Sequence, residues 1–255
     1  MAVGIRYGLE GFRQGLKEGY HSLRAPTIFD KGCVLFLPLN SAPNRITPDL
    51  SGCGNHGILY GPVLKDIGEE YYLKFKNRLV TVGGKGFYFD GADDGIKLNY
   101  DASLDIFTSD SWAIEMWFKP DEQVMTGDLV NAVWHKPRLY VNTSQELVLA
   151  AFIGGTYTVL ISGSSATYVG TKTTYLVMQA NPQSGNYEMW INGVLKVSVA
   201  YQQMDGGWSI LTIGNANNSQ EFYKGFIYLV RFYSRFLSER EIKLHYMIEK
   251  DMFRV

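Results

Sequence analysis

The stretch Ser-Trp-Ala-Ile-Glu-Met-Trp-Phe-Lys-Pro at residues 111–120 alternates between two sets of side chains. Successive side chains of an extended strand point to opposite faces, so the large apolar residues from Trp112 to Phe118 line one face. The positions between them are mixed and include Glu115 and Trp117. This pattern predicts a strand that packs one face against a core.

Short stretches of the same period continue on both sides of this strand, from residue 26 onward. Asn192-Gly193 lies between two of them, and both residue types tolerate the positive φ of a tight hairpin turn. Many short strands with glycine-rich turns predict an all-β, two-sheet antiparallel sandwich. The other expected strands are Cys33–Leu37, Phe87–Phe89, Gly95–Tyr100, Arg138–Val141, Glu146–Phe152, Thr156–Ile161, Thr174–Gln179, Tyr187–Ile191, Val194–Val199, Ser209–Ile213 and Phe226–Tyr233.

Four further motifs accompany the stretch at 111–120. They are Pro-Asp-Leu-Ser-Gly-Cys-Gly-Asn-His-Gly at 48–57, Phe-Asp-Gly-Ala-Asp-Asp-Gly at 89–95, a hairpin at 187–195 and a closing strand at 225–238. In order and spacing, the set resembles the concanavalin A-like laminin-G/pentraxin superfamily, over residues 33–242. The resemblance implies a laminin-G-like jelly roll, in a family whose members bind ligands far more often than they cleave them.

Composition limits the other possibilities. The chain has 255 residues, 46% of them hydrophobic, which is enough for one large core in a single main domain at 27–255. Its formal net charge of -1 gives no support for nucleic-acid binding, and no apolar stretch is long enough for a transmembrane helix. Cys33 and Cys53 either form one disulfide or are free thiols, as two cysteines in a large domain more often are.

The first 26 residues have a different pattern, which predicts an amphipathic helical arm. Glycines recur at helical spacing, and each is followed directly by an apolar residue. Because glycine weakens an isolated helix, the arm needs something packed against its glycine stripe. We expect it to dock with copies of itself, giving a homo-oligomer, or with a scaffold protein; the alternatives are a helix laid over the chain's own sheet and a flexible leader. The stripes are Gly4, Gly8, Gly11, Gly15, Gly19 and Ile5, Leu9, Phe12, Leu16, Tyr20.

The N-terminus shows neither the apolar core nor the cleavage site of a secretory signal, which predicts synthesis in the cytoplasm. The resemblance, in contrast, implies a location outside cells. Display on a virus particle or another extracellular surface after cytoplasmic synthesis would reconcile the two expectations.

Two segments extend the sandwich. Residues 61–86 exceed the outline of the family and mix aromatic with charged residues, which predicts an extra hairpin that covers a sheet edge. Ser238 and Glu241 form a capping box that starts a C-terminal helix running towards Lys250. Ile242, Tyr246 and Phe253 would pin that helix to the sandwich.

Nothing in the sequence supports catalysis. Glycosidases of the concanavalin-like fold place several carboxylates at short intervals on one strand. Here Glu115 and Glu188 stand without such partners, and no nucleophile elbow, phosphate loop or zinc spacing is present. We therefore expect a protein that is not an enzyme.

A calcium site is implied by the resemblance at Asp49, Asn55 and Asp93, which lie in two oxygen-rich turns. The alternative is that these residues cap the backbone of their own turns and bind no metal. A structural calcium ion is the sole cofactor considered.

Glycan binding would need exposed aromatic rings near amides and carboxylates at one rim of the sandwich. Two neighbouring loops supply such residues, whereas Trp112, Trp117 and Trp190 lie within strands and are expected in the core. The proposed rim is Trp208, Asn215, Asn217 and Glu221, with Trp134 and Tyr201 as further candidates.

The interpretation preferred from the sequence is a non-catalytic structural or interaction subunit, most concretely a virion surface or capsid-associated protein, whose sandwich presents a binding surface. The alternative is a carbohydrate-binding, lectin-like domain, and the third possibility is a glycoside hydrolase. An assembly subunit should lose its partners without the arm, whereas a lectin should lose glycan binding in Trp208→Ala.

Overall fold

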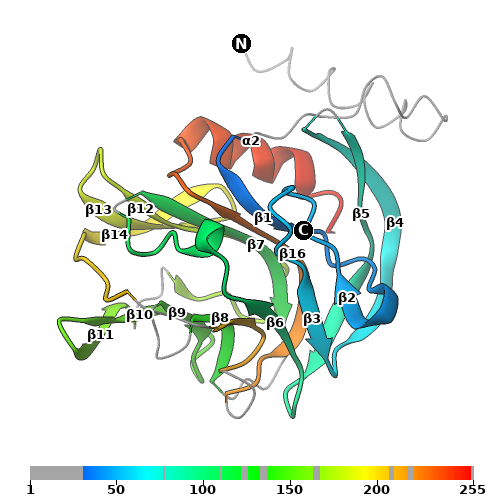
Figure 1. Ribbon diagram of the computed structural model, residues 1–255, viewed down its shortest axis with the longest axis horizontal. Helices are drawn as coiled ribbons and strands as arrows, with labels where there is room; N and C mark the ends of the chain where they lie inside the picture. Colours follow the sequence, from blue (N-terminus) through cyan, green and yellow to red (C-terminus); the bar gives the residue numbers. More distant parts are fainter. Residues whose placement is uncertain are drawn as a thin grey trace.

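The computed structural model describes residues 31–76, 78–109, 111–121, 126–132, 137–162, 167–206, 210–216 and 221–253. The helical arm expected at residues 1–26 lies outside the described residues and stays a prediction. The described chain forms two stacked antiparallel sheets with one C-terminal helix on the outside (Figure 1). The all-β sandwich and the C-terminal helix are thus confirmed. No helix of the described chain has the length and apolar character to cross a membrane.

Sheet A has the order β14-β13-β12-β7-β16-β5-β4, and β1 pairs with β16. Sheet B has the order β11-β10-β9-β8-β15-β6-β3-β2. The strands of sheet A are β1 (Cys33–Leu37), β4 (Val63–Phe75), β5 (Arg78–Asp90), β7 (Trp112–Pro120), β12 (Thr174–Asn181), β13 (Asn186–Ile191), β14 (Val194–Ala200) and β16 (Lys224–Tyr233). Those of sheet B are β2 (Ile46–Thr47), β3 (Gly57–Tyr60), β6 (Gly95–Asn99), β8 (Gly127–Ala132), β9 (Arg138–Val141), β10 (Leu147–Ile153), β11 (Thr156–Ile161) and β15 (Ile210–Ile213).

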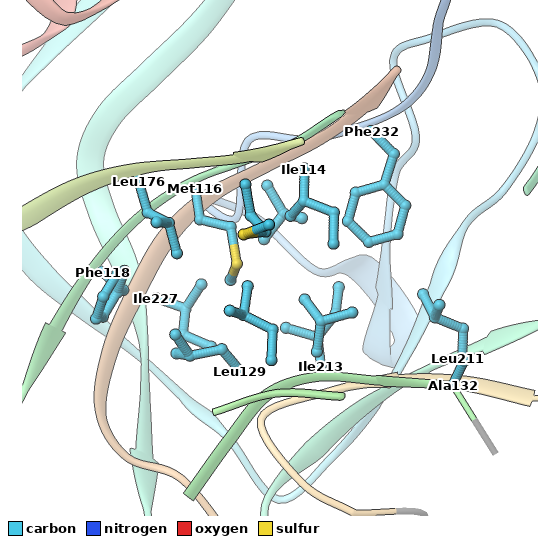
Figure 2. Close-up of a cluster of buried hydrophobic side chains, with 14 of the residues drawn as sticks. Ile114, Met116, Phe118, Leu129, Ala132, Leu176, Leu211, Ile213, Ile227 and Phe232 are labelled. Carbon is cyan, nitrogen blue, oxygen red and sulfur yellow. The ribbon is translucent and has the colours of Figure 1, made fainter. Parts of the chain in front are cut away.

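The main core lies between the two sheets (Figure 2). Strand β7 is central in sheet A and contributes Ile114, Met116 and Phe118, which meet Leu129 and Ile213 of sheet B. All of these side chains are fully buried. The alternation at residues 111–120 therefore predicted both the strand and its inward face.

A second core lies on the outer face of sheet A. Trp117 of β7 packs there against Tyr246 of helix α2 (Glu239–Glu249), with the ring centroids 6.0 Å apart and stacked. The ring of Phe253, which follows the helix, lies 5.0 Å from that of Trp117, measured between centroids. Ser238 caps α2 in the expected capping box, and Ile242 is fully buried. The predicted anchoring of the C-terminal helix is confirmed.

Residues 61–86 form a long hairpin of β4 and β5 at the edge of sheet A, as expected for an edge extension. Its pairing shifts between Asp66 and Glu70, opposite Gly83 and Gly84, which have φ of 70° and 68°. A β-bulge of this kind bends the strands. Beyond the bend, Leu73 joins the second core.

The sequence analysis predicted no strand at the position of β8. A bulge between Asp128 and Val130 breaks its alternation, so Leu129 and Val130 both face the core. Asp128 and Asn131 therefore point away from the main core, towards the outer face of sheet B. The two cysteines are free thiols, Cys33 buried and Cys53 exposed.

Candidate functional site

The outer face of sheet B carries a cluster of polar and aromatic side chains. Leu139 and Val141 of β9 belong to the core, so Arg138 and Tyr140 point the opposite way. Register pairs Arg138 with Asn131 and Tyr140 with Asp128 on the neighbouring strand β8. We call the outward set Asp128, Asn131, Arg138, Tyr140, Tyr157 and Glu221 the Arg138 face.

Arg138 is the centre of this face. Its Nε donates to Asp128 Oδ1 at 2.8 Å, and its second terminal nitrogen lies 2.6 Å from Glu221 Oε2. The other terminal nitrogen donates to the Tyr157 hydroxyl at 3.4 Å, and the guanidinium carbon lies 4.1 Å from the centre of the Tyr140 ring. The planar guanidinium therefore holds two carboxylates and two rings in fixed positions.

Asp128 is the buried partner of this arrangement. Its side chain has no exposed surface, whereas that of Glu221 is 34% exposed. Burial raises the pKa of Asp128 to about 7, against the opposing effects of the Arg138 charge and a hydrogen bond from Asn131. Glu221 is thus the carboxylate of the pair that reaches solvent.

Aromatic rings flank the pair on the same face. Tyr157 of β11 is 38% exposed, and its ring contacts Phe152 of β10 at a centroid distance of 5.8 Å. Tyr140 is half-buried against Arg138. An exposed ring and a half-buried ring beside a solvent-facing carboxylate match the expected surface of a glycan site, and of these three residues Glu221 is the one that the sequence analysis named.

Of the predicted rim residues, Glu221 belongs to this face. Its backbone carbonyl accepts from Asp128 N at 2.9 Å, which ties its loop to β8. Asn215 is buried, and its Nδ2 donates to the Asp94 carbonyl at 3.1 Å. Tyr201 follows the last residue of β14 in sheet A, and its ring packs on that of Tyr187. Trp208, Asn217 and Trp134 lie outside the described residues.

The three residues expected to bind calcium do not form one cluster. Asp49 and Asn55 precede β3, where Asp49 accepts bonds from the backbone of Phe36 and Ser51, both at 2.8 Å, and of Asn55 at 2.9 Å. Asp93 belongs to the turn before β6, at the opposite end of β3. Asp49 therefore caps backbone, the alternative considered for these turns.

The turn that contains Asp93 brings three carboxylates together. Ligand oxygens of Asp90, Asp93 and Asp94 lie within 4.8 Å of one another, a spacing that suits a hard cation. Burial, followed by the charges of Asp90 and Asp93, raises the pKa of Asp94 to about 6, while a hydrogen bond from the Asp90 backbone opposes this. A calcium ion held here stays a prediction.

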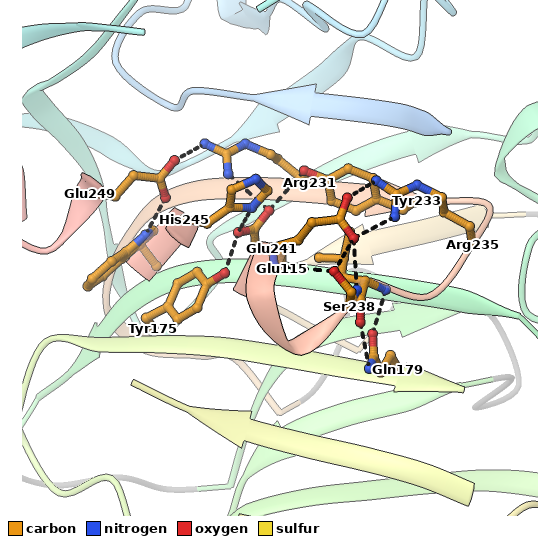
Figure 3. A network of polar contacts seen from close by, with 12 residues as sticks. Glu115, Tyr175, Gln179, Arg231, Tyr233, Arg235, Ser238, Glu241, His245 and Glu249 are labelled. Carbon is orange, nitrogen blue, oxygen red and sulfur yellow. Dashed lines mark hydrogen bonds and ion pairs between the residues drawn. The ribbon is translucent and has the colours of Figure 1, made fainter. Parts of the chain in front are cut away.

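The two carboxylates considered for hydrolysis are buried structural groups. Glu115 contacts His245 Nδ1 at 2.8 Å and accepts from Arg231 at 2.9 Å and Tyr233 at 3.0 Å (Figure 3). Burial alone would raise the pKa of Glu115, but His245 and Arg231 outweigh it and hold that pKa well below its usual value.

Glu188 is also buried, and it accepts from Gln179 at 2.8 Å and Trp190 at 3.1 Å. Burial opposes these hydrogen bonds, yet the net effect lowers the pKa of Glu188. Neither carboxylate is placed to act as an acid or nucleophile on a substrate from solvent.

Sequence reasoning missed Asp128, Asn131, Arg138, Tyr140 and Tyr157. In β11, alternation gave no signal for Tyr157, because the core residue Ile161 lies four positions away, across a register shift. The alternation of β9 contained a usable signal, because it places Arg138 and Tyr140 opposite the core residues Leu139 and Val141. What it lacked was the pairing of β9 with the bulged strand β8, which brings Asp128 to Arg138.

Comparisons with known proteins agree with this fold. The family described as the Concanavalin A-like lectin/glucanases superfamily (Laminin_G_3) matches residues 90–243, more than half of the chain. No curated protein sequence matches the chain significantly.

Among solved structures, domain 4 of AbnA, a GH43 extracellular arabinanase from Geobacillus stearothermophilus in complex with arabinotriose, is similar at a TM-score of 0.53 and 18% identity. The match covers 83% of this chain and 96% of that domain. The binding domain of botulinum neurotoxin serotype D (TM-score 0.56, 17% identity, 86% of this chain) is matched over 52% of its length. The binding domain of Paraclostridial Mosquitocidal Protein 1 is similar at a TM-score of 0.58 and 16% identity, and the match covers 84% of this chain and 52% of that domain. The chain thus spans about half of these toxin domains, and the likeness shows the fold.

Proposed function

Because the chain belongs to the concanavalin A-like lectin/glucanase superfamily, we propose that it is a non-catalytic carbohydrate-binding domain whose ligand contacts the Arg138 face of sheet B. The comparisons favour this lectin-like alternative over the structural subunit preferred from the sequence. Domain 4 of the arabinanase was determined with a bound sugar, and the toxin relatives are binding domains.

One observation carries the proposal: buried Arg138 fixes Tyr140, Tyr157 and Glu221 on one outward face. An exposed tyrosine ring offers an apolar surface to the C–H face of a sugar, and a fixed carboxylate accepts hydrogen bonds from hydroxyl groups. Since Arg138 holds these groups before a ligand arrives, little conformational entropy is lost on binding.

The test is a glycan array, followed by titration of the best ligand. Tyr157→Ala removes the exposed ring and is expected to weaken binding at least about tenfold, a typical loss for an aromatic contact at the centre of a binding site. Circular dichroism should show the fold unchanged, because Tyr157 is 38% exposed.

The matched control is Tyr100→Ala, which removes a tyrosine ring that is 52% exposed after β6, across sheet B from β11. Its affinity should equal that of the wild type. Equal binding by wild type and Tyr157→Ala would exclude this face as the site.

The structural-subunit interpretation, with virion display and docking through the arm, stays a prediction, because residues 1–26 lie outside the described residues. Comparing the solution mass of the full chain with that of a chain that starts at Thr27 would examine self-association through the arm.

A further inference from the structure

We propose that the Arg138 face selects neutral glycans and rejects glycans that carry carboxylate or sulfate groups. This inference rests on the proposed function and adds the class of ligand. It follows from how the charges on this face are already paired.

The single cation of the face is already occupied. Nε and one terminal nitrogen of the Arg138 guanidinium donate hydrogen bonds to Asp128 and Tyr157, and the other terminal nitrogen forms an ion pair with Glu221 that lacks hydrogen-bond geometry. The Arg138 side chain is only 9% exposed, and the Tyr140 ring lies against one side of the guanidinium. An incoming anion would have to displace Glu221 to reach the guanidinium, so Arg138 organises the face without serving as an anion receptor.

The solvent-facing charge of the face is negative. Glu221 is the member of the ion-paired group with a substantially exposed side chain, and an ionised carboxylate accepts hydrogen bonds without donating any. It therefore favours hydroxyl donors, which every neutral sugar has. A ligand carboxylate or sulfate beside Glu221 would add a like charge at short range and lose its own hydration.

The surroundings add to this negative potential. The turn before β6 lies at the same end of sheet B as Asp128, because Asn215 links them: its side chain contacts Asp94, and its loop contacts β8. Lys97 of β6 also points outward, since its neighbours Ile96 and Leu98 are core residues. Acidic side chains at this end of sheet B include Asp90, Asp93, Asp94 and Glu221, against the basic Lys97 and Lys224, while Asp128 and Arg138 form an ion pair with each other.

The experiment compares matched neutral and anionic sugars on the full chain. An array would carry galactotriose beside trigalacturonate and lactose beside sialyllactose, together with arabinotriose. The expected result is binding of at least one neutral sugar, with its anionic counterpart at least about tenfold weaker.

Two further measurements assign the selectivity to charge. In Glu221→Gln, which keeps an acceptor oxygen but removes the charge, the neutral-to-anionic affinity ratio should fall at least about threefold. Glu239→Gln on α2, where the side chain is 61% exposed, should leave the ratio unchanged. Raising the salt from about 0.05 M to about 0.5 M should narrow the ratio in the wild type, and this measurement does not depend on any variant folding.

The failures are distinguishable. If the wild type binds an anionic sugar as tightly as its neutral counterpart, the selectivity is refuted while the carbohydrate-binding function stands. A wild type that binds none of the neutral or anionic sugars would instead count against the proposed function itself.

Discussion

Replacing Arg231 by Met is expected to lower the free energy of unfolding by about 3–5 kcal/mol at neutral pH. Arg231 is fully buried beneath α2 and pairs with both Glu115 and Glu249 (Figure 3). Without its charge, two carboxylates would stay buried next to each other with His245 as the remaining basic group. Urea denaturation followed by tryptophan fluorescence would measure the loss.

The loss should shrink at acid pH. In Arg231→Met, the close approach of two carboxylates raises the pKa of one of them, and protonation of that carboxylate in the folded state then relieves the repulsion. Stability of the variant relative to wild type therefore rises as the pH falls from about 7 to about 5.

The control is Lys243→Met on the same helix, where Lys243 and Glu239 form an exposed ion pair with side chains 53% and 61% exposed. Its effect should stay within about 0.5 kcal/mol. An Arg231→Met protein as stable as Lys243→Met would contradict the role of Arg231 as the charge partner that keeps α2 on sheet A.

Trp117→Ala is expected to cost about 3–5 kcal/mol of unfolding free energy, the range typical of a large aromatic side chain removed from a core. The Trp117 ring is fully buried, and Tyr175, Tyr246 and Phe253 surround it at centroid distances of 5.1, 6.0 and 5.0 Å. Its Nε1 also donates to Glu249 Oε2 at 2.7 Å.

Trp117→Phe separates packing from hydrogen bonding. This variant keeps an aromatic ring between sheet A and α2 but removes the donor to Glu249, so a smaller loss of about 1–3 kcal/mol is expected. Chemical denaturation of both variants would measure the two losses. A loss below about 1 kcal/mol in Trp117→Ala would show that the second core contributes little to stability.

Alternation and turn chemistry predicted much of the fold because they act locally. The alternation at residues 111–120 predicted which side chains of β7 point to each face of its sheet. Asn192 and Gly193 have the expected positive φ, of 53° and 75°. Strand β8 was not predicted, because a bulge between Asp128 and Val130 interrupts the alternation of its side chains. Its inward residues Leu129 and Val130 are consecutive in sequence.

The site was less predictable, because it depends on contacts between distant strands. Glu221 was expected at a glycan-binding rim, which stays a prediction, and its partner Arg138 comes from a strand that is far away in sequence and reaches it across β8. Asn215 lies in the same loop, yet it points into the protein and donates to the Asp94 carbonyl. Loop composition gave the neighbourhood of the site, while strand register decided which side chains face outward together.

The most direct measurement of the central claim is a map of backbone amide chemical shifts in isotope-labelled protein, titrated with the neutral glycan that binds best on the array. The account predicts that the largest ligand-dependent shifts cluster on Tyr140, Tyr157, Glu221 and their neighbours on β8 to β11, and that they disappear in Tyr157→Ala. Shifts that gather instead on the β4–β5 hairpin or around α2, with sheet B unaffected, would contradict it.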